Sequence, residues 1–318
     1  MPRGTSAGLI AITMQDSVFL TGASGYLGRH LLGLLVELAF PRVVCLVRST
    51  AASPTGGREI DTVVADLSEP QRYFDALSRC DTVIHLAPAT GKLPKKEYFR
   101  VNEDGTRALV NACREAGVKR FLHVSTIAVE FHNVRHYHYA VSKRAAEGIV
   151  AESGMAWCIV RPTMIVGEGA PVLEGLKKLA SAPIVPVFGD GKALVQPVFV
   201  EDLARMLVEI VRQRAFEGKI LEAGGPQPMT IEELLAAIRR VLLKKAPRFA
   251  HLPVGPCAAV LALLENLLLP VMPLTAGQLA SFINDGSAPK NSLGEQWGIR
   301  PKSVEEVLGM VAHERRAA

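Results

Sequence analysis

The stretch Ser17-Val-Phe-Leu-Thr-Gly-Ala-Ser-Gly-Tyr-Leu-Gly28 decides the fold of this chain. An apolar run, Ser17–Thr21, predicts a strand that leads into three glycines spaced G-x-x-G-x-x-G, and an apolar helical pattern follows at Tyr26–Leu38. Glycines permit a tight turn and a close approach to a pyrophosphate, and a helix N-terminus offers free N–H groups. Between a strand and a helix, this spacing predicts a dinucleotide-binding βαβ unit.

Strand and helix patterns alternate through the first half of the chain. Further strands are predicted at Arg42–Val47, Asp61–Ala65, Thr82–Leu86, Arg120–Ser125 and Ala156–Val160. Helical patterns separate them at Glu69–Arg79, Lys96–Ala116 and Tyr137–Glu152. Strands that alternate with helices form βαβ units, and right-handed crossovers place helices on both faces of a parallel sheet. The expected fold is α/β, a doubly wound parallel sheet of the Rossmann type.

The pattern changes after Arg161-Pro162, where the chain becomes irregular and rich in Pro and Gly. We expect an N-terminal extension at 1–14, a dinucleotide-binding domain at 15–165, and a smaller substrate lobe at 166–318 that is interleaved with the sheet. Helices of this lobe are predicted at Val172–Leu179, Val200–Gln213, Thr230–Leu243 and Pro256–Leu269.

The composition limits the class of protein. With 318 residues, 49% hydrophobic and 21% charged, the chain is predicted to be globular rather than disordered. The net charge is +5, but no nucleic-acid-reading motif accompanies the basic residues, so no nucleic-acid partner is expected. The five cysteines are widely spaced without a C-x-x-C pair, which favours reduced thiols and a cytoplasmic location.

The apolar segment at 256–269 contributes to the positive mean hydropathy of +0.22. The longest charge-free apolar run, Val254–Leu264, is shorter than the roughly 20 residues of a membrane-spanning helix, so none is expected. Three interpretations of the segment stay open: the core of the lobe, the surface of a homodimer, or a patch that lies on a membrane or a larger complex.

Cofactor selectivity is expected to depend on the end of the second strand. About 20 residues after the glycines, sites that prefer NAD place an Asp or Glu on the adenosine ribose. This chain has Leu46-Val47-Arg48-Ser49 there, without an acid. Arg48 offers a planar guanidinium that matches the 2′-phosphate of NADP, and Arg29 is a second candidate contact. We therefore expect NADP, with NAD as the alternative.

A tyrosine and a lysine stand four residues apart in Tyr139-Ala-Val-Ser-Lys143, which places them on one face of a helix. The ammonium would lower the phenol pKa from about 10, so that Tyr139 can exchange a proton with a substrate oxygen. Lys143 would also hydrogen-bond the cofactor ribose. The preceding strand ends in Ser125-Thr126, whose hydroxyls would hold the substrate oxygen. Together these residues predict hydride transfer to or from a nicotinamide.

These motifs together resemble the extended short-chain dehydrogenase/reductase superfamily. The resemblance extends over about residues 17 to 204. Besides the glycine loop and the Tyr–Lys pair, it rests on Asp66-Leu67, Ile84-His85-Leu86-Ala87, Val101-Asn102-x-x-Gly105-Thr106, Val124-Ser125-Thr126, Glu147, Arg161-Pro162 and Phe199-Val200-Glu201-Asp202-Leu203-Ala204.

The resemblance implies a role for several residues. Asp66 and Leu67 would flank the adenine, and Asn102 would support the active-site helix. The expected catalytic residues are Tyr139, Lys143 and Thr126, with Ser125 close to the nicotinamide. The expected cofactor-binding residues are Gly22, Ser24, Gly25, Tyr26, Leu27, Gly28, Arg29, Arg48, Asp66, Leu67, Leu86, Ala87 and Lys143. No metal site is expected, because no carboxylate or cysteine completes the group His132, His136 and His138.

A narrower resemblance points to the branch that contains the 39 kDa accessory subunit of respiratory complex I. It rests on Gln196-Pro-Val-Phe-Val-Glu-Asp202 and on Pro273-Leu-Thr-x-x-Gln-Leu279 with Asp285. That subunit binds NADPH and is regarded as structural, so the resemblance implies a non-catalytic alternative. The chain has Glu130-Phe131 where sugar epimerases and dehydratases commonly carry Tyr-Gly, and Pro88 replaces a small residue.

Three functional hypotheses follow from these residues. The first is an NADP(H)-dependent oxidoreductase that acts on a carbonyl or secondary alcohol of a small molecule. The second is a nucleotide-sugar epimerase or dehydratase, and the third is a non-catalytic NADPH-binding assembly protein. The sequence of the C-terminal lobe contains no motif that identifies the substrate.

Overall fold

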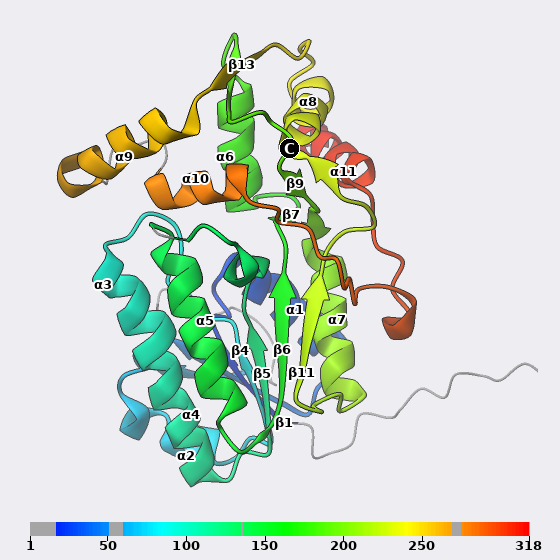
Figure 1. Cartoon of the computed structure of the whole chain (residues 1–318). Coiled ribbons are helices and arrows are strands. Elements are labelled where there is room, and N and C mark those ends of the chain that lie inside the picture. Colours follow the sequence, from blue (N-terminus) through cyan, green and yellow to red (C-terminus); the bar gives the residue numbers. More distant parts are fainter. Residues whose placement is uncertain (1–16, 51–59, 135, 269–274, 318) are drawn as a thin grey trace, which may run out of the picture.

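A parallel sheet of seven strands organises residues 17 to 223 (Figure 1). The computed structural model describes residues 17–50, 60–134, 136–268 and 275–317, so the predicted extension at 1–14 lies outside the described residues. The strands are β1 (Ser17–Thr21), β2 (Arg42–Val47), β3 (Ile60–Val64), β4 (Thr82–His85), β5 (Arg120–Val124), β6 (Ala156–Pro162) and β11 (Lys219–Ala223). The predicted doubly wound α/β fold is confirmed.

The order of the strands fixes where a ligand can bind. Across the sheet it runs β11-β6-β5-β4-β1-β2-β3, and every neighbouring pair is parallel. The chain direction across the sheet reverses between β1 and β4, and ligands of such sheets bind outside the carboxyl ends of the strands at this point. The glycine loop follows β1 and therefore lies at this crevice.

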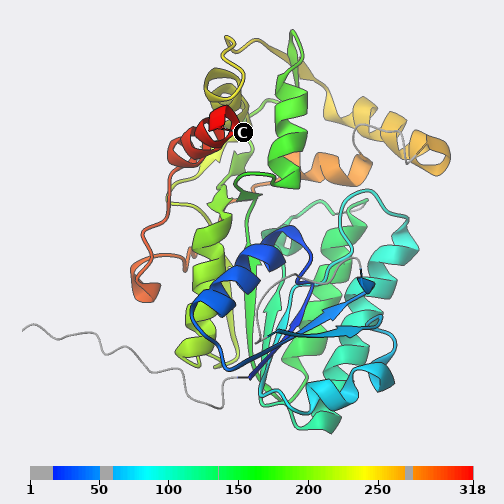
Figure 2. The ribbon, with the colours of Figure 1, turned by 180° about the vertical axis from the view of Figure 1, so that it is seen from behind.

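Helices cover both faces of the sheet and create two apolar cores. Figure 2 shows α1 (Tyr26–Glu37) and α7 (Val200–Arg212) side by side on one face. On the other face lie α2 (Phe74–Leu77), α3 (Lys95–Tyr98), α4 (Gly105–Ala116) and α5 (His138–Ala151). The strands read as near-continuous apolar runs because both faces are buried.

Three predicted helices differ from the observed ones. The helix predicted at Val200–Gln213 as part of the lobe is α7, which packs beside α1 on the sheet. The pattern at Glu69–Arg79 forms only a 3-10 turn, Pro70–Arg72, followed by the single turn of α2. The long helix predicted at Lys96–Ala116 contains a π-helical turn, Phe99–Asp104, between α3 and α4. Such insertions often occur at functional sites, and this one carries Asn102.

A smaller lobe sits above the carboxyl ends of the strands (Figure 1). Its helices are α6 (Pro171–Ala180), α8 (Ile231–Val241), α9 (Val254–Leu268), α10 (Ala276–Ile283) and α11 (Val304–Ala317). The lobe also contains three short strand pairs. β7 (Ile165–Val166) pairs with β10 (Val198–Phe199), and β8 (Val185–Phe188) pairs with β13 (Phe249–Leu252). The third pair is β9 (Leu194–Val195) with β12 (Met229–Thr230). No helix among the described residues is long and apolar enough to cross a bilayer.

Candidate active site

The glycine loop packs too closely to admit side chains at two positions. Gly22 has a φ of +77°, and a Cβ on it would lie 2.7 Å from the carbonyl carbon of Leu86 and 2.8 Å from the amide nitrogen of Ala87. A Cβ on Gly28 would lie 2.0 Å from the carbonyl oxygen of Gly22. The predicted cofactor residues of β1, the loop and the end of β4 therefore form one continuous backbone surface.

Gly28→Ala is expected to abolish tight binding of a nicotinamide dinucleotide and to lower Tm by several degrees. The added methyl group would meet backbone atoms, and overpacking costs about 1–3 kcal/mol, or several degrees in Tm. Calorimetric titration with NADPH and thermal unfolding would measure both effects. Gly33→Ala on the same helix is the matched control, because no atom lies within 4 Å of its Cβ position. Equal losses in the two variants would contradict this account of the loop.

The N-terminus of α1 fits a diphosphate group. Gly25 is its N-cap, no side chain caps it, and its first turn carries no acidic residue. Its free N–H groups and its helix dipole therefore face the crevice without competition from a carboxylate. The side chain of Leu27 is buried in the core, so this residue contributes its backbone, whereas Ser24 and Arg29 are exposed.

Basic side chains gather where the adenosine end of a dinucleotide is expected. Arg48 is exposed directly after β2, and its charge acts on Asp66, which follows β3. Arg100, from the π-helical turn, places Nη1 3.8 Å from Oδ1 of Asp66. Partial burial would raise the pKa of Asp66, but hydrogen bonds from Ser68 and the charges of Arg100 and Arg48 together lower it. Sequence reasoning did not assign Arg100 to this site, because only the fold brings it beside Asp66.

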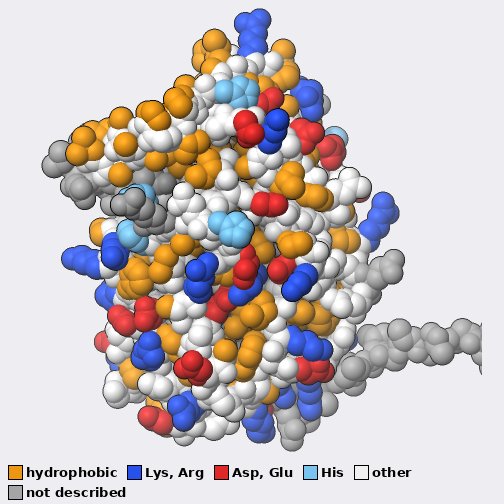
Figure 3. Space-filling view, in the orientation of Figure 1, with side chains coloured by type: hydrophobic (Ala, Val, Ile, Leu, Met, Phe, Trp, Pro, Cys, Tyr) orange, Lys and Arg blue, Asp and Glu red, His pale blue; other side chains and the backbone are white. Residues whose placement is uncertain are grey.

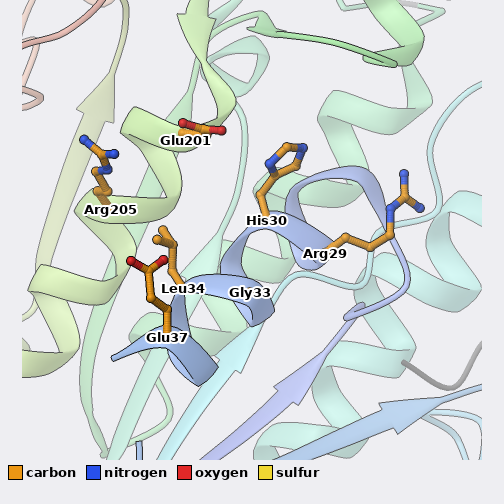
Figure 4. A pocket seen from close by; sticks show the side chains of 7 residues that line it. All are labelled: Arg29, His30, Gly33, Leu34, Glu37, Glu201 and Arg205. Carbon is orange, nitrogen blue, oxygen red and sulfur yellow. The ribbon is translucent and has the colours of Figure 1, made fainter. Parts of the chain in front are cut away.

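Arg29 lies back over the glycine loop, where Nη1 donates to the backbone oxygen of Ser24 over 2.9 Å. It also borders a depression of about 290 Å³ on the outer face between α1 and α7 (Figure 4). That depression is further lined by His30, Gly33, Leu34, Glu37, Glu201 and Arg205. Figure 4 shows Arg29 directed away from Glu201 and Arg205. None of Ser125, Thr126, Tyr139 and Lys143 lines this depression, so it is separate from the predicted catalytic residues.

The predicted catalytic side chains meet at the carboxyl end of β5. Tyr139 lies in the first turn of α5 and shares a hydrogen bond with the hydroxyl of Thr126. Thr126 Oγ1 also accepts from the amide of Ala128 over 3.2 Å, which fixes its rotamer. Lys143 lies one turn further along α5, is 3% exposed, and donates from Nζ to the carbonyl oxygen of Val124 over 2.8 Å. The structure therefore brings Thr126, Tyr139 and Lys143 together as predicted from their spacing.

The pKa values of this group differ from the sequence-based expectation. Burial raises the pKa of Tyr139 above its usual value and outweighs the lowering by the Thr126 hydrogen bond. Burial lowers the pKa of Lys143 to about 7, although the Glu147 carboxylate opposes this effect. The expected lowering of the phenol pKa by Lys143 is not observed, because Nζ is directed to the Val124 carbonyl and to His123. Tyr139 is therefore held protonated and able to donate.

Lys143→Met is expected to remove a pH dependence of stability. The folded pKa of about 7 lies below the ordinary 10.5, so the unfolded chain binds more protons between these values. The free energy of unfolding of the native protein should therefore rise with pH in this window, by about 2 kcal/mol from pH ~7.5 to ~9, relative to the variant. Urea unfolding at several pH values measures the difference. Parallel curves for the two proteins would show that Lys143 titrates normally.

His123 is a buried neighbour of Lys143 that sequence reasoning missed. Its Nε2 lies 3.1 Å from Lys143 Nζ, and its ring stacks on that of His85 with centroids 5.3 Å apart. Burial and the Lys143 charge lower the pKa of His123 well below 6.5, so it is neutral. The sequence signal was a histidine within an otherwise apolar strand, two residues before Ser125.

A buried polar network connects the glycine loop to the catalytic helix. His85 Nδ1 lies 2.7 Å from Thr21 Oγ1 and its Nε2 lies 3.0 Å from Thr106 Oγ1, so both ring nitrogens have protein partners. Thr106 in turn donates to the carbonyl oxygen of Asn102 over 2.6 Å. Burial lowers the pKa of His85 to about 3, which keeps it neutral.

Asn102 continues this network to α5. Its Oδ1 accepts from the amide of Ala89 over 2.7 Å, and its Nδ2 donates to Ser142 Oγ over 2.9 Å. Ser142 Oγ donates to the carbonyl oxygen of Tyr139 over 2.9 Å. Asn102 thus holds the first turn of α5 in place, which agrees with the supporting role that the family resemblance implies.

Two buried polar atoms near Lys143 fit a polar ligand at this crevice. Ser125 Oγ and His123 Nδ1 are buried without a hydrogen-bond partner among the described residues. A buried hydroxyl without a partner is costly, and a ligand can satisfy it. Together with the side-chain-free surface of the glycine loop, Ser125 makes this site fit a nicotinamide dinucleotide.

The motifs of the narrower resemblance have internal structural roles here. Gln196 is buried, donates from Nε2 to the carbonyl oxygen of Gly225 over 2.7 Å, and accepts at Oε1 from the amide of Ala288 over 2.8 Å. Asp202 accepts from the amide of Lys302 over 2.8 Å. The pair Thr275 and Gln278 forms a capping box at the start of α10. These contacts account for the motifs without a partner protein, and the resemblance to the complex I branch stays a prediction.

Comparison with known proteins agrees with this site. The model of the NAD dependent epimerase/dehydratase family matches residues 18–224. The ceramide reductase of Caulobacter vibrioides is 35% identical over 248 residues, which cover 77% of this chain and 76% of the relative. The decarboxylating sterol-4-alpha-carboxylate 3-dehydrogenase of Mus musculus is 25% identical over 289 residues, covering 83% and 78% of the two chains.

A solved structure shows the same fold. The UDP-glucose 4-epimerase of Thermus thermophilus in complex with NAD superimposes with a TM-score of 0.71 at 20% identity, over 95% of this chain and 99% of that one. The glycine loop, the Tyr139–Lys143 pair and the family match support the same conclusion. The chain belongs to the NAD dependent epimerase/dehydratase family, within the extended short-chain dehydrogenase/reductases, and is an NAD(P)-dependent oxidoreductase or epimerase.

Proposed function

We propose that this protein is an NADP(H)-dependent reductase of a carbonyl group, with the secondary alcohol as product. The observation that carries the proposal is the hydrogen-bonded pair of Thr126 and Tyr139, with Lys143 one helical turn away. Burial keeps the Tyr139 phenol protonated, and a protonated phenol is the form that a reduction requires, because the carbonyl oxygen must receive a proton.

Each of these side chains has a separate role in the proposed reaction. A bound nicotinamide supplies the hydride for the carbonyl carbon. Tyr139 donates the proton to the carbonyl oxygen, and the Thr126 hydroxyl helps to hold that oxygen within reach. Lys143, four residues along the same helix face, would hydrogen-bond the ribose of the bound cofactor. Asn102 and Ser142 hold the first turn of the helix during the transfer.

The proposed preference for NADP rests on charge. The region after β2 carries Arg48 and no acid, and Arg100 adds a second guanidinium near Asp66. A guanidinium can bind a 2′-phosphate through two parallel hydrogen bonds, whereas the 2′-hydroxyl of NAD calls for an acidic acceptor.

We further propose that the substrate is a lipid with an oxo group. Two relatives, the ceramide reductase and the sterol dehydrogenase, have lipid substrates in their names. The surroundings of Tyr139 support this class, because the rings of Tyr98 and Tyr137 lie 6.3 Å and 5.8 Å from it, centroid to centroid. Phe131 stacks on Tyr137 at 6.2 Å, and Ala280 of α10 packs on this cluster from the lobe. An apolar wall of this kind suits a hydrocarbon chain.

The test is turnover of the 3-oxo form of ceramide, dispersed in detergent, by the full-length protein with NADPH. We expect NADPH oxidation and a product that has gained two hydrogens by mass spectrometry. A short-chain ketone should react with a higher KM, because it lacks the chains that the apolar wall binds. Turnover of UDP- or dTDP-sugars, with none of the oxo-lipid, would favour an epimerase. No turnover of any carbonyl compound despite NADPH binding would favour the non-catalytic alternative.

A further inference from the structure

Helix α9 exposes an apolar face over residues 256–263. It extends from the lobe beyond the rest of the molecule (Figure 1), and Figure 3 shows hydrophobic side chains along its outer edge. The exposed side chains between 254 and 264, where their burial is described, are Pro256, Ala259, Val260 and Leu263, whose spacing of about four residues defines one side of the helix. Val260 is 56% exposed and Leu263 is 72% exposed. The interpretation of this segment as lobe core is therefore wrong for this face.

Helix α9 is connected to the candidate active site through α10. Helix α9 packs against α10, and α10 packs in turn on the segment that precedes Tyr139. A Cβ on Gly277 of α10 would lie 2.5 Å from the carbonyl oxygen of His136, so these backbones are in direct contact. The apolar face thus belongs to the unit that borders the aromatic cluster around Tyr139.

The chain that leads into α9 is strongly basic. No Asp or Glu occurs between Glu233 and Glu265. Within this interval Arg240, Lys244, Lys245 and Arg248 are exposed, whereas Arg239 is buried and donates to the carbonyl oxygen of Ala180 over 2.7 Å. The nearby carboxylate of Glu232 is paired with His251 at 2.8 Å. Figure 1 shows β13 and α9 at the same end of the molecule, away from the sheet.

We propose that α9 docks on an anionic lipid bilayer. Pro256, Ala259, Val260 and Leu263 would enter the boundary between headgroups and acyl chains, and the basic residues before β13 would contact anionic headgroups. At about 1.5 Å per residue, its 15 residues extend about 22 Å, a length suited to lying in the plane of the interface. The route of the substrate rests on the proposed function, because it requires an oxo-lipid that would leave the bilayer beside α10 and reach Tyr139.

A second copy of the chain fits this face less well. A stable interface buries about 800 Å² on each partner, more than four side chains on a protruding helix provide. In a symmetric pair, the basic residues before β13 would also face their own copies, and like charges across an interface are unfavourable. Anionic headgroups complement both the apolar face and the charge.

The experiment is flotation of the full-length protein with vesicles of phosphatidylglycerol or of phosphatidylcholine. We expect binding to phosphatidylglycerol that weakens with salt, and little binding to phosphatidylcholine. Val260→Glu/Leu263→Glu should weaken vesicle binding by more than about tenfold. The control Ile220→Glu/Met310→Glu adds the same charge at two exposed apolar residues outside α9, which are 45% and 37% exposed, and should bind like the native protein. Lys244→Gln/Lys245→Gln should reduce both the binding and its salt dependence.

Three outcomes would overturn the proposal: no vesicle binding by the native protein, equal binding by the two glutamate variants, or a native dimer that Val260→Glu/Leu263→Glu converts to a monomer without vesicle binding. Thermal unfolding shows whether each variant is folded. Flotation requires no turnover, and reduction of detergent-dispersed oxo-lipid requires no bilayer. Failure of the docking helix and failure of the proposed reaction therefore give different results.

Discussion

Tyr139→Phe is expected to lower kcat by about 10²–10⁴-fold, the usual contribution of a proton donor, and to leave the Kd for NADPH within about twofold. Phe keeps the ring that packs beside Tyr98 and Tyr137 and removes only the hydroxyl that bonds to Thr126. The substitution should therefore slow the proton transfer and leave cofactor binding intact. Steady-state rates with the oxo-lipid and calorimetric titration with NADPH measure the two quantities.

The matched control is Tyr137→Phe. The hydroxyl of Tyr137 bonds to Ser281 rather than to Thr126, so this variant should lose little turnover. If the native protein turns over a genuine substrate and Tyr139→Phe does so equally fast, Tyr139 is not the proton donor. If both variants lose turnover equally, the effect comes from packing around the cluster.

Arg48→Ala is expected to raise the Kd for NADPH by about 10–100-fold and to leave the Kd for NADH unchanged. A hydrogen bond to a charged group contributes about 1.5–3 kcal/mol, and each 1.4 kcal/mol corresponds to a factor of ten. Only NADPH carries the 2′-phosphate that the guanidinium would bind. Titration of both cofactors against the native protein and the variant therefore isolates this contact.

Arg79→Ala is the control for the loss of one positive charge. Arg79 is exposed and precedes β4, at the amino ends of the strands, whereas Arg48 follows the carboxyl end of β2. The variant Arg79→Ala should leave the Kd for NADPH and the Kd for NADH unchanged at moderate salt. Equal affinity of the native protein for NADPH and NADH would overturn the cofactor preference, whatever the variant does.

The proposed catalytic group was predictable from sequence because its parts are local. Tyr139 and Lys143 lie one turn apart on one helix, and Ser125 and Thr126 directly follow the strand before it. The pKa values were not predictable. They depend on how completely the lobe and the sheet exclude water, and that burial raises the pKa of Tyr139 and lowers that of Lys143.

The non-local contacts around the site were also beyond sequence reasoning. Arg100, in the π-helical turn, lies beside Asp66 because the fold brings β3 and this turn together. The seventh strand, β11, was missed because its residues, Lys219–Ala223, form a short run with two charged side chains at the sheet edge. Gln196 and Asp202, which the resemblance to the complex I branch singled out, hold loops within the chain through contacts between distant segments.

The sequence by itself predicted the strand–glycine–helix unit and the Tyr139–Lys143 pair, because each depends on spacing within a few residues. It predicted the parallel sheet from the alternation of strand and helix patterns. Only the tertiary structure decided that His85 and His123 stack in the core, that Asn102 holds α5, and that one face of α9 is exposed. These features depend on contacts between residues far apart in the chain. The physical reason is that burial sets the charge state of a titratable side chain, and burial depends on how the whole molecule packs.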